Sequence, residues 1–563
     1  MKVIIVGGVA GGATAAARIR RLDEHAEITV FERSGYISYA NCGLPYYIGD
    51  VITDPEELTL QTPESFFKRF RINMKIHHEV ISIHPDRKIV SVKNLENDEI
   101  FEENYDKLIL SPGAKPTQPR LPGVGIDKVF TLRTVEDTFR IKEYINKNHP
   151  KSAVLAGGGF IGLELAENLR ELGMDVTIVQ RPKQLMNPFD PDMASMIHNE
   201  MRKHGIKLVL GYTVEGFKEK DNGVEVLLKD NPSLQADMVV LAIGVTPDTV
   251  LAKEAGLELG IKESIVVNDR METSVPDIYA AGDAVQVKHY VTGNDALISL
   301  AGPANKQGRI IADNICGGDS RYLGSQGSSV IKVFDMTAST TGINETNAKK
   351  SGLEVDTVIL SPMSHAGYYP GGKVMTMKVV FEKESYRLLG AQIIGYEGVD
   401  KRIDVLATAI HAGLNATQLK DLDLAYAPPY SSAKDPVNMA GFMIDNIAKG
   451  TLKQWHLEDM DKISKDKDVV LLDVRTVGEF SRGHIDGFKN IPVDELRERI
   501  SEIEKGKPAY LICQSGLRSY IASRILEGNG YETYNFSDGF RFYDAVVNDR
   551  ALIERAYACG MDY

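Results

Sequence analysis

A cysteine near the N-terminus stands in a sequence suited to sulfur redox chemistry. Cys42 lies in the stretch SYANCGLP (38–45), between a Ser/Asn pair and a turn-forming Gly/Pro pair. A thiolate at this position would attack a sulfur atom, and a helix N-terminus or a nearby positive charge would lower the pKa of the thiol. The alternative is a buried, inert cysteine. We predict that Cys42 is the redox centre.

A second cysteine, near the other end of the chain, has a signature of its own. Cys513 follows the apolar run AYLI (509–512) and heads the loop CQSGLRS (513–519). A cysteine between a strand and a helix can be surrounded by backbone N–H groups, and Arg518 adds positive charge, so a thiolate or persulfide would be stabilised. The sequence therefore predicts a second reactive sulfur at Cys513.

Two glycine clusters, each between a buried-type strand and a helix, predict the elements that position Cys42. The first is GGVAGG (7–12), and the strand after its helix ends at an acidic residue suited to ribose hydroxyls. Such glycines let the backbone approach a pyrophosphate at a helix N-terminus. The middle position is valine rather than glycine, and a tight turn without a ligand is the alternative. The predicted dinucleotide residues here are Gly7, Gly8, Val9, Ala10, Gly12 and Glu32.

The second cluster, GGGFIG (157–162), is an intact fingerprint. Two such fingerprints in one chain are difficult to explain as loop turns. The following strand ends at Gln180-Arg181, without a carboxylate that would repel a 2′-phosphate and with an arginine that could bind one, so both NADH and NADPH remain open. The predicted nicotinamide-dinucleotide residues are Gly157, Gly159, Phe160, Ile161, Gly162 and Gln180.

Length and composition restrict the class of protein. A chain of 563 residues, 43% apolar and 25% charged, is a globular protein too long for a single core. The net charge of −13 argues against general affinity for nucleic acid. Its four cysteines are too scattered for a disulfide framework or a metal site, and no apolar run approaches the ~18 residues of a membrane span. We expect a cytoplasmic protein without a metal, nucleic-acid or membrane partner.

With two further motifs, these residues resemble the two-dinucleotide-binding-domain flavoprotein reductases, in the branch of coenzyme A (CoA) disulfide reductases and NADH-dependent persulfide reductases. The specific marks are the stretch 38–45, the turn AGD (281–283) and the motif AYAPPY (425–430). Residues from 472 onward look like a rhodanese domain, through DVR (473–475), GHI (483–485) and the Cys513 loop. Val9 is also found in this branch, and the resemblance covers nearly the whole chain.

The resemblance implies an α/β fold with two Rossmann-like dinucleotide-binding domains, an α+β dimerisation domain and a C-terminal α/β rhodanese domain. It implies a homodimer with FAD, NAD(P)H and coenzyme A as cofactors. The expected domains are an FAD-binding domain in two parts (1–115 and 248–325), an NAD(P)-binding domain (116–247), the dimerisation domain (326–446), a linker (447–456) and the rhodanese domain (457–563).

The resemblance also assigns roles around Cys42. Relatives with a redox dithiol carry a second cysteine about five residues on, where this chain has Tyr47, so the partner sulfur must come from outside. In the family that partner is CoA. Arg18 and Arg21, at i and i+3 on one helix face, could pair with its phosphates unless they are only a solvated face. Ser38 and Asn41 could hydrogen-bond its pantetheine amides.

Further site residues follow from the resemblance alone. For CoA these are Gln61, Arg71, Asn305, Arg309 and Lys434; for FAD, Arg33, Ser111, Gly113, Asp283 and Ala301; and for NAD(P), Gly244. Tyr368 and Tyr426 are the implied proton donors, contributed across a dimer interface. Packing of tyrosines in Pro-rich turns is the alternative, and Tyr369 and Tyr430 are the competing choices.

The leading hypothesis is an NAD(P)H reductase of sulfane sulfur (CoA persulfide or polysulfide), of CoA disulfide, or of both, acting on small-molecule thiol and persulfide substrates. Cys513 would pick up or deliver the sulfur. One alternative is an NADH peroxidase or oxidase in which Cys42 cycles through a sulfenic acid. Another is a non-catalytic sulfur-trafficking or redox-sensing protein.

Overall fold

The computed structural model describes residues 1–117, 119–221 and 223–559, with side chains as far as residue 555. The last four residues of the predicted rhodanese domain lie outside this range. The chain forms two compact units, residues 1–182 with 205–327, and residues 183–204 with 328–563. Within the described part, none of the helices has the length and apolar character that crossing a bilayer requires.

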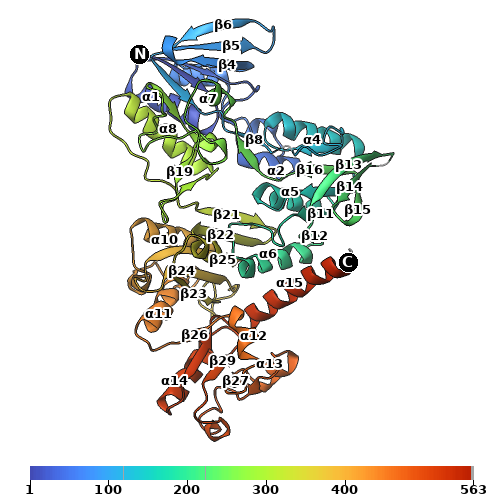
Figure 1. Cartoon of the computed structure of the whole chain (residues 1–563), viewed down its shortest axis with the longest axis vertical. Helices are drawn as coiled ribbons and strands as arrows, with labels where there is room; N and C mark the ends of the chain where they lie inside the picture. The colour runs from blue at the N-terminus through green and yellow to red at the C-terminus, as the bar shows by residue number, and fades with distance from the viewer. Residues whose placement is uncertain (118, 222, 560–563) are drawn as a thin grey trace. The chain divides into compact units, whose positions relative to one another are not determined.

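The first unit contains the first glycine module, which we define as residues 2–32. Its sheet has the order β18-β7-β1-β2-β3, and every neighbouring pair is parallel. Apolar runs buried on both faces are typical of such sheets. Helices α1 and α8 lie side by side (Figure 1). The bounds are β1 Lys2–Val6, α1 Ala10–Leu22, β2 Glu27–Phe31, β3 Asn73–Lys75, β7 Lys107–Leu110, β18 Ile278–Ala280 and α8 Ala301–Ile315.

The second glycine module, residues 152–180, lies in a second parallel sheet of the same unit, with the order β12-β11-β10-β16-β9. Its elements are β9 Val129–Thr131, α4 Val135–Asn148, β10 Ser152–Ala156, α5 Phe160–Glu171, β11 Asp175–Gln180, β12 Lys207–Leu210 and β16 Met238–Leu241. Two parallel sheets with glycine turns after their first strands agree with the predicted pair of dinucleotide folds.

Smaller antiparallel sheets and short helices complete the first unit. Their bounds are α2 Leu44–Ile48, α3 Pro63–Phe70, β4 His78–His84, β5 Ile89–Asn94, β6 Ile100–Asn104, β8 Ala114–Pro116, β13 Val214–Lys220, β14 Gly223–Leu228, β15 Asn231–Ala236, β17 Val245–Pro247, α7 Val250–Glu254, β19 Val287–Lys288 and β20 Asp295–Ala296.

The second unit contains an antiparallel sheet with the order β21-β22-β25-β24-β23, together with helices. The bounds are α6 Pro191–Lys203, β21 Ser329–Val333, β22 Met336–Gly342, α9 Glu345–Lys350, β23 Val355–Leu360, β24 Thr376–Glu382, β25 Leu388–Gly395, α10 Val399–His411 and α11 Pro436–Ala448. Strands followed by helices on an antiparallel sheet are an α+β arrangement, as predicted.

A parallel sheet with the order β26-β30-β29-β27-β28 completes this unit. Its elements are β26 Gln454–Trp455, α12 Met460–Ile463, β27 Val470–Asp473, α13 Val477–Arg482, β28 Lys489–Asn490, β29 Ala509–Ile512, α14 Leu517–Gly528, β30 Thr533–Phe536 and α15 Phe540–Cys559. Helix α15 packs on α6, where His198 and Arg202 both contact the buried carboxylate of Asp549.

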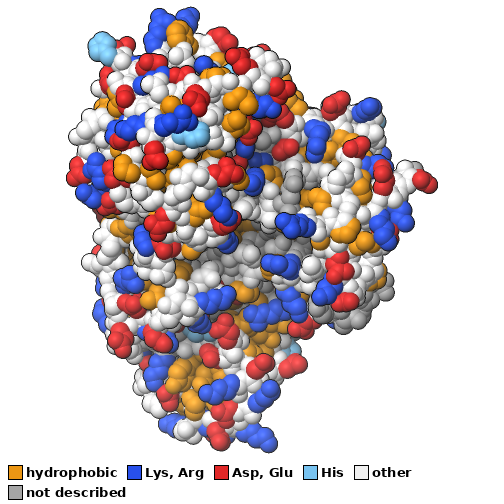
Figure 2. All heavy atoms as spheres, turned by 45° about the horizontal axis from the view of Figure 1, so that its top comes forward, with side chains coloured by type: hydrophobic (Ala, Val, Ile, Leu, Met, Phe, Trp, Pro, Cys, Tyr) orange, Lys and Arg blue, Asp and Glu red, His pale blue; other side chains and the backbone are white. Residues whose placement is uncertain are grey.

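The predicted fold class is confirmed, because parallel dinucleotide-type sheets, an antiparallel sheet and a C-terminal parallel sheet follow one another along the chain. The domain boundaries given above remain predictions. Figure 2 shows basic and acidic side chains interspersed over the face in view.

Candidate active site

The first glycine turn has a backbone that only glycine allows. Gly7 has φ +96°, and a Cβ there would lie 2.1 Å from the carbonyl oxygen of Ser111. A Cβ on Gly12 would lie 1.9 Å from the carbonyl oxygen of Gly7, so α1 begins in direct contact with the turn. Val9 has a negative φ, −103°, with ψ −136°. This position therefore does not need the left-handed conformation that favours glycine.

Glu32 directly follows β2, beside this turn. Its carboxylate is buried and accepts hydrogen bonds from the backbone N–H groups of Gly8 and Ser34, both at 2.9 Å. A carboxylate has about four lone-pair positions and so keeps acceptors for a ribose. With the bare helix N-terminus from Ala10 onward, the turn fits a dinucleotide pyrophosphate next to its ribose.

The second glycine turn repeats this construction. Gly157 has φ +119°, and a Cβ on Gly162 would lie 2.1 Å from the carbonyl oxygen of Gly157. No atom lies within 4 Å of a Cβ built on Gly159, which leaves room for a ligand to approach the backbone. The side-chain oxygen of Gln180 accepts the N–H of Gly158 at 3.0 Å. Phe160 and Ile161 open helix α5.

Cys42 is held next to both modules within the first unit. The N–H of Ser38, which has φ +46°, donates to the carbonyl oxygen of Gly8 at 2.9 Å. Cys42 lies in a 3₁₀ turn, Asn41–Gly43, that runs directly into α2. On that helix Tyr46 donates to Glu164 of α5, with 3.4 Å between the oxygens. The thiol is exposed and forms no disulfide among the described residues.

The electrostatics of Cys42 differ from the expectation of a lowered pKa. Surrounding protein atoms desolvate the thiol and, with the negative charge of Glu164, raise the pKa of Cys42; the guanidinium of Arg133 lowers it by less. Burial also raises the pKa of Glu164 to about 7. Arg133 supplies the positive charge that we expected, but burial and the charge of Glu164 affect the pKa of Cys42 more strongly. In this structure the thiol form of Cys42 is therefore favoured.

Sequence reasoning missed both Glu164 and Arg133. Glu164 follows the glycine fingerprint by two residues. An acidic residue so close to the fingerprint is the sequence feature that could have identified it. Arg133 lies outside any motif. Its guanidinium donates to the carboxylate of Asp283 at 2.7 Å, beside the turn at Gly113, which has φ +71°. Arg133 thus joins two residues predicted to bind flavin.

The other predicted flavin residues lie at the edge of the first module. Arg33 is paired with Asp248 at 2.9 Å, and the N–H of Asp248 donates to the carbonyl oxygen of Gly113. Ser111 follows β7 next to Gly7, and Ala301 opens helix α8. Gly244 has φ +109° and its carbonyl oxygen accepts the N–H of Thr117. These positions surround the two turns, and their ligand roles stay predictions.

Several residues predicted to bind CoA meet on one seam between α1 and α8. Arg18 of α1 contacts Asp313 of α8 at 2.8 Å, and Arg309 approaches the same carboxylate at 3.9 Å. Thr14 donates to the side-chain oxygen of Asn305 at 2.5 Å. Thr14 and Asp313 were missed by the sequence analysis. The helices come this close because glycines face each other, a Cβ on Gly308 lying 2.4 Å from the carbonyl oxygen of Gly11.

The remaining predicted CoA residues divide into two groups. Arg21 is exposed at the end of α1, and Gln61 forms a bridge with Ile37, next to Ser38. Arg20, which is buried, donates to the carbonyl oxygen of Arg71 at 3.0 Å and so holds the end of α3 against α1. Lys434 belongs to the second unit and is not brought together with the others within the first.

Tyr368 and Tyr426 lie together in the second unit. Their hydroxyl oxygens are 2.8 Å apart and both side chains are exposed, Tyr368 to 75%. Tyr369 instead packs edge-on against His365, and Tyr430 takes no part in the hydroxyl pair. A cavity of about 560 Å³ adjoins Tyr426 and Tyr430. The geometry favours the predicted pair over the competing tyrosines, and the role of proton donor stays a prediction.

Cys513 follows strand β29 and is buried, with 1% of its side chain exposed. Its sulfur accepts hydrogen bonds from the N–H of Gly516 at 3.1 Å and from the hydroxyl of Ser519 at 3.2 Å. Gly516 has φ +87°, so the loop curls back towards the sulfur. Ser519 was not singled out from the sequence. Arg518 points both terminal nitrogens at Glu479 rather than at the sulfur.

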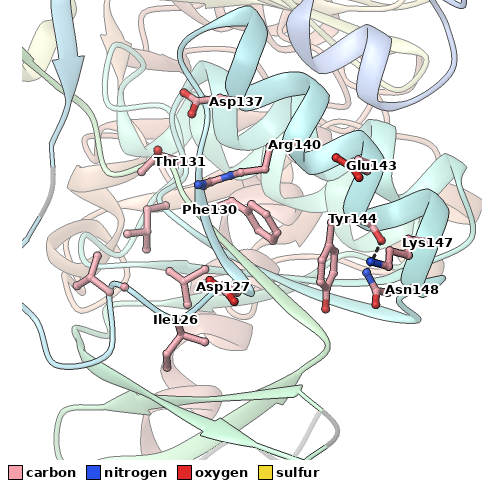
Figure 3. A pocket seen from close by; sticks show the side chains of 14 residues that line it. Ile126, Asp127, Phe130, Thr131, Asp137, Arg140, Glu143, Tyr144, Lys147 and Asn148 are labelled. Atoms are coloured by element: carbon pink, nitrogen blue, oxygen red, sulfur yellow. Dashed lines mark hydrogen bonds between the residues drawn. The ribbon is translucent and has the colours of Figure 1, made fainter. Parts of the chain in front are cut away.

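A cavity of about 570 Å³ lies elsewhere in the first unit, between β9 and α4. Figure 3 shows Arg140, Tyr144 and Lys147 of α4 on one side of it and Phe130 of β9 on the other. The guanidinium of Arg140 stacks over the ring of Phe130, 5.2 Å from its centroid. No predicted site residue lines this cavity.

Comparison with known proteins places these features in one family. Residues 1–308 match the family description "Pyridine nucleotide-disulphide oxidoreductase", residues 328–436 its dimerisation domain, and residues 456–545 a rhodanese-like domain. A coenzyme A disulfide reductase of Staphylococcus aureus is 38% identical over 442 residues, which cover 78% of this chain and 99% of that protein.

Two solved structures match nearly the whole chain. The reduced CoADR-RHD of Bacillus anthracis is 48% identical with a TM-score of 0.95, over 98% of each chain. A NAD-dependent persulfide reductase from A. fulgidus is 38% identical with a TM-score of 0.90, over 96% of this chain and all of that one. The family implies FAD and NAD(P)H, and the dimerisation domain indicates a homodimer. This chain belongs to the coenzyme A disulfide reductase and persulfide reductase branch of the pyridine nucleotide-disulphide oxidoreductases, with a C-terminal rhodanese domain.

Proposed function

We propose that this enzyme uses NAD(P)H to reduce sulfane sulfur in CoA persulfide or polysulfide, or CoA disulfide, at Cys42, with Cys513 carrying sulfur in the rhodanese domain. The observation that carries the proposal is an exposed free thiol beside two dinucleotide turns, with Tyr47 where a second cysteine would stand. Because no second cysteine stands beside it, Cys42 can form a disulfide or persulfide only with a sulfur that comes from outside this motif.

The seam between α1 and α8 supports CoA as the carrier of that sulfur. Arg18 and Arg309 share the single carboxylate of Asp313, and Arg21 is exposed. The guanidinium groups of the seam therefore outnumber this carboxylate, and guanidinium groups pair with phosphates. Asn305 adds amide donors and acceptors. The seam starts at the first glycine turn, to which Ser38 is also bonded, so one rigid element positions both the proposed CoA site and the cysteine.

The chemistry at Cys42 is sulfur exchange followed by reduction. The Cys42 thiolate attacks the outer sulfur of R–S–SH, so that a new S–S bond forms, the old one breaks and R–S⁻ leaves with the bonding electrons. Two electrons from NAD(P)H then return Cys42 to a thiolate and release hydrosulfide. A flavin held at the first glycine module, beside Gly7, Gly12 and Glu32, would supply the electron transfer between nicotinamide and sulfur. Overall, R–S–SH, NAD(P)H and H⁺ give R–SH, H₂S and NAD(P)⁺.

Nearby side chains would supply the protons of this reaction and affect the ionisation of Cys42. The departing R–S⁻ needs a proton, and the paired hydroxyls of Tyr368 and Tyr426, reaching over from the second subunit of a dimer, are the proposed donors. Desolvation raises the pKa of the Cys42 thiol, and the negative charge of Glu164 raises it further.

The test is Cys42→Ser in the full-length protein. We expect loss of NAD(P)H-dependent turnover of CoA persulfide and CoA disulfide, with the flavin absorbance retained. Cys316→Ser is the matched control, because this cysteine is half-buried at the end of α8 and has no proposed role. Turnover that survives Cys42→Ser would reject the assignment. Faster turnover of H₂O₂ than of CoA persulfide by the unmodified enzyme would favour the peroxidase alternative instead.

A further inference from the structure

Two arginines at the Cys513 loop, Arg518 and Arg475, are paired with carboxylates. The two terminal nitrogens of Arg518 contact the two oxygens of Glu479 at 2.7 and 2.8 Å, a bidentate pair. This contact holds the pKa of Glu479 at about 2, so that the carboxylate is charged throughout the working pH range.

Arg475 is neutralised in the same way. It is buried, and its guanidinium contacts both oxygens of Asp473, the shortest distance being 2.7 Å. Its remaining donors reach Gln514 and the carbonyl oxygen of Gly483, and its plane covers the ring of Phe540, 3.8 Å from the centroid. Arg475 therefore has little left to offer an anionic ligand.

Apolar side chains flank the Arg518–Glu479 pair. Val477 opens α13 and Leu517 opens α14, and they are 64% and 65% exposed. The pair ties the starts of these two helices together, so both side chains lie near the same loop. Ile521, one turn further along α14, is also exposed. An organic group would find apolar surface here.

We propose that Glu479 is a specificity-determining residue which, by neutralising Arg518, makes Cys513 accept sulfur from organic persulfides in preference to thiosulfate. This rests on the proposed sulfurtransferase role of Cys513. Thiosulfate is a dianion, and two arginines paired with two carboxylates offer it no net charge. An organic persulfide carries at most one negative charge at the reacting end, against two on thiosulfate, and it reacts as R–S–SH. It also brings an apolar group to the rim.

The transfer itself is a balanced exchange. The Cys513 thiolate attacks the outer sulfur of R–S–SH, giving Cys513–S–SH while R–S⁻ leaves with the electrons of the broken S–S bond. No net oxidation occurs. The N–H of Gly516 and the hydroxyl of Ser519 already point at Cys513 and hold the attacking sulfur.

The test measures the rate of Cys513 persulfidation by mass spectrometry in the full-length protein without NAD(P)H. The two donors are thiosulfate and the persulfide of N-acetylcysteine methyl ester, which carries no other charge. We expect the organic persulfide to load Cys513 at least about tenfold faster than thiosulfate does. An unpaired arginine would favour the thiosulfate dianion by about tenfold, and the pairing with Glu479 removes that advantage. Glu479→Gln should raise the thiosulfate-to-persulfide rate ratio about tenfold.

A double variant separates this role from a structural one. Glu479 also caps α13 through Thr476, and a glutamine keeps an acceptor for that bond. In Glu479→Gln the guanidinium of Arg518 loses its carboxylate partner. If that guanidinium attracts thiosulfate, adding Arg518→Gln should return the thiosulfate-to-persulfide rate ratio to that of the unmodified protein. Equal loading from both donors in the unmodified protein, or a ratio that Glu479→Gln leaves unchanged, overturns the role of Glu479. Loading from neither donor rejects instead the sulfurtransferase function on which it rests.

Discussion

The two glycine modules of the first unit share one construction and differ at one charge. In the first, the N–H of Gly8 donates to Glu32; in the second, the N–H of Gly158 donates to Gln180. The same contact therefore pins the turn to the end of the second strand in both. The side chain of Glu32 is a carboxylate, and it also accepts the N–H of Ser34. The side chain of Gln180 is an uncharged amide. We therefore predict that the first module accepts ribose hydroxyls and that the second tolerates a 2′-phosphate.

The arginines that follow these residues extend the difference. Arg33 is paired with Asp248 at 2.9 Å. Arg181 is exposed, and among the described residues no ion pair involves it. A cation without a carboxylate partner, beside an uncharged amide, is suited to a 2′-phosphate. The comparison teaches that a shared fold leaves nucleotide choice to the residues at one strand end.

The largest expected effect comes from the glycine in the first turn of each helix, Gly12 in α1 and Gly162 in α5. Gly12→Ala would put a Cβ 1.9 Å from the oxygen of Gly7, and Gly162→Ala one 2.1 Å from the oxygen of Gly157. Overpacking of this kind costs about 1–3 kcal/mol, or about 5- to 150-fold in binding. We expect Gly12→Ala to be purified without flavin and Gly162→Ala to keep flavin while its reduction by NAD(P)H slows.

The measurements are flavin absorbance and anaerobic flavin reduction by NAD(P)H. Gly125→Ala is the control, because a Cβ there meets no atom within 4 Å and φ is not positive. If Gly162→Ala lost flavin as readily as Gly12→Ala, the two modules would not be independent nucleotide sites, and the comparison would fail.

An exchange of the strand-end residues should give an intermediate effect. Glu32→Gln removes a charged acceptor and should weaken flavin binding about tenfold, since a hydrogen bond to a charged group is worth about 1.5 kcal/mol. Gln180→Glu should raise the KM for NADPH about tenfold, because a carboxylate repels the 2′-phosphate, and should raise that for NADH less. Flavin titration and steady-state kinetics with both nucleotides measure this. A fall in the KM for NADPH would show that Gln180 does not face the ribose.

Local pattern predicted these turns, whereas the charges around the two reactive sulfurs depended on tertiary packing. Gly7, Gly157 and the ends of their strands were readable because one backbone geometry requires those residues within a short segment. Glu164 reaches Tyr46, 118 residues away, and Glu479 reaches Arg518, 39 residues away. No spacing rule connects such pairs. The sequence therefore predicted reactive cysteines but not the carboxylates that set their chemistry.

The smallest expected effect concerns Glu164, through which the second module acts on Cys42. Burial raises its pKa from the ordinary 4.5 to about 7, so the folded protein holds this proton more tightly than the unfolded chain. The contribution of Glu164 to stability therefore falls as pH rises from 4.5 to about 7, and Glu164→Gln should remove that slope. Above pH 7 the charge of Glu164 opposes ionisation of Cys42. Glu164→Gln should therefore speed alkylation of Cys42 roughly threefold.

Iodoacetamide labelling of Cys42 against pH and urea unfolding at several pH values measure both parts. Glu171→Gln, at the exposed end of the same helix, is the control and should follow the unmodified protein. Slower alkylation in Glu164→Gln would mean that the carboxylate assists the thiol instead of opposing it. The second glycine module would then help to activate Cys42 through Glu164. The two modules would differ in their part in catalysis as well as in the nucleotide that each binds.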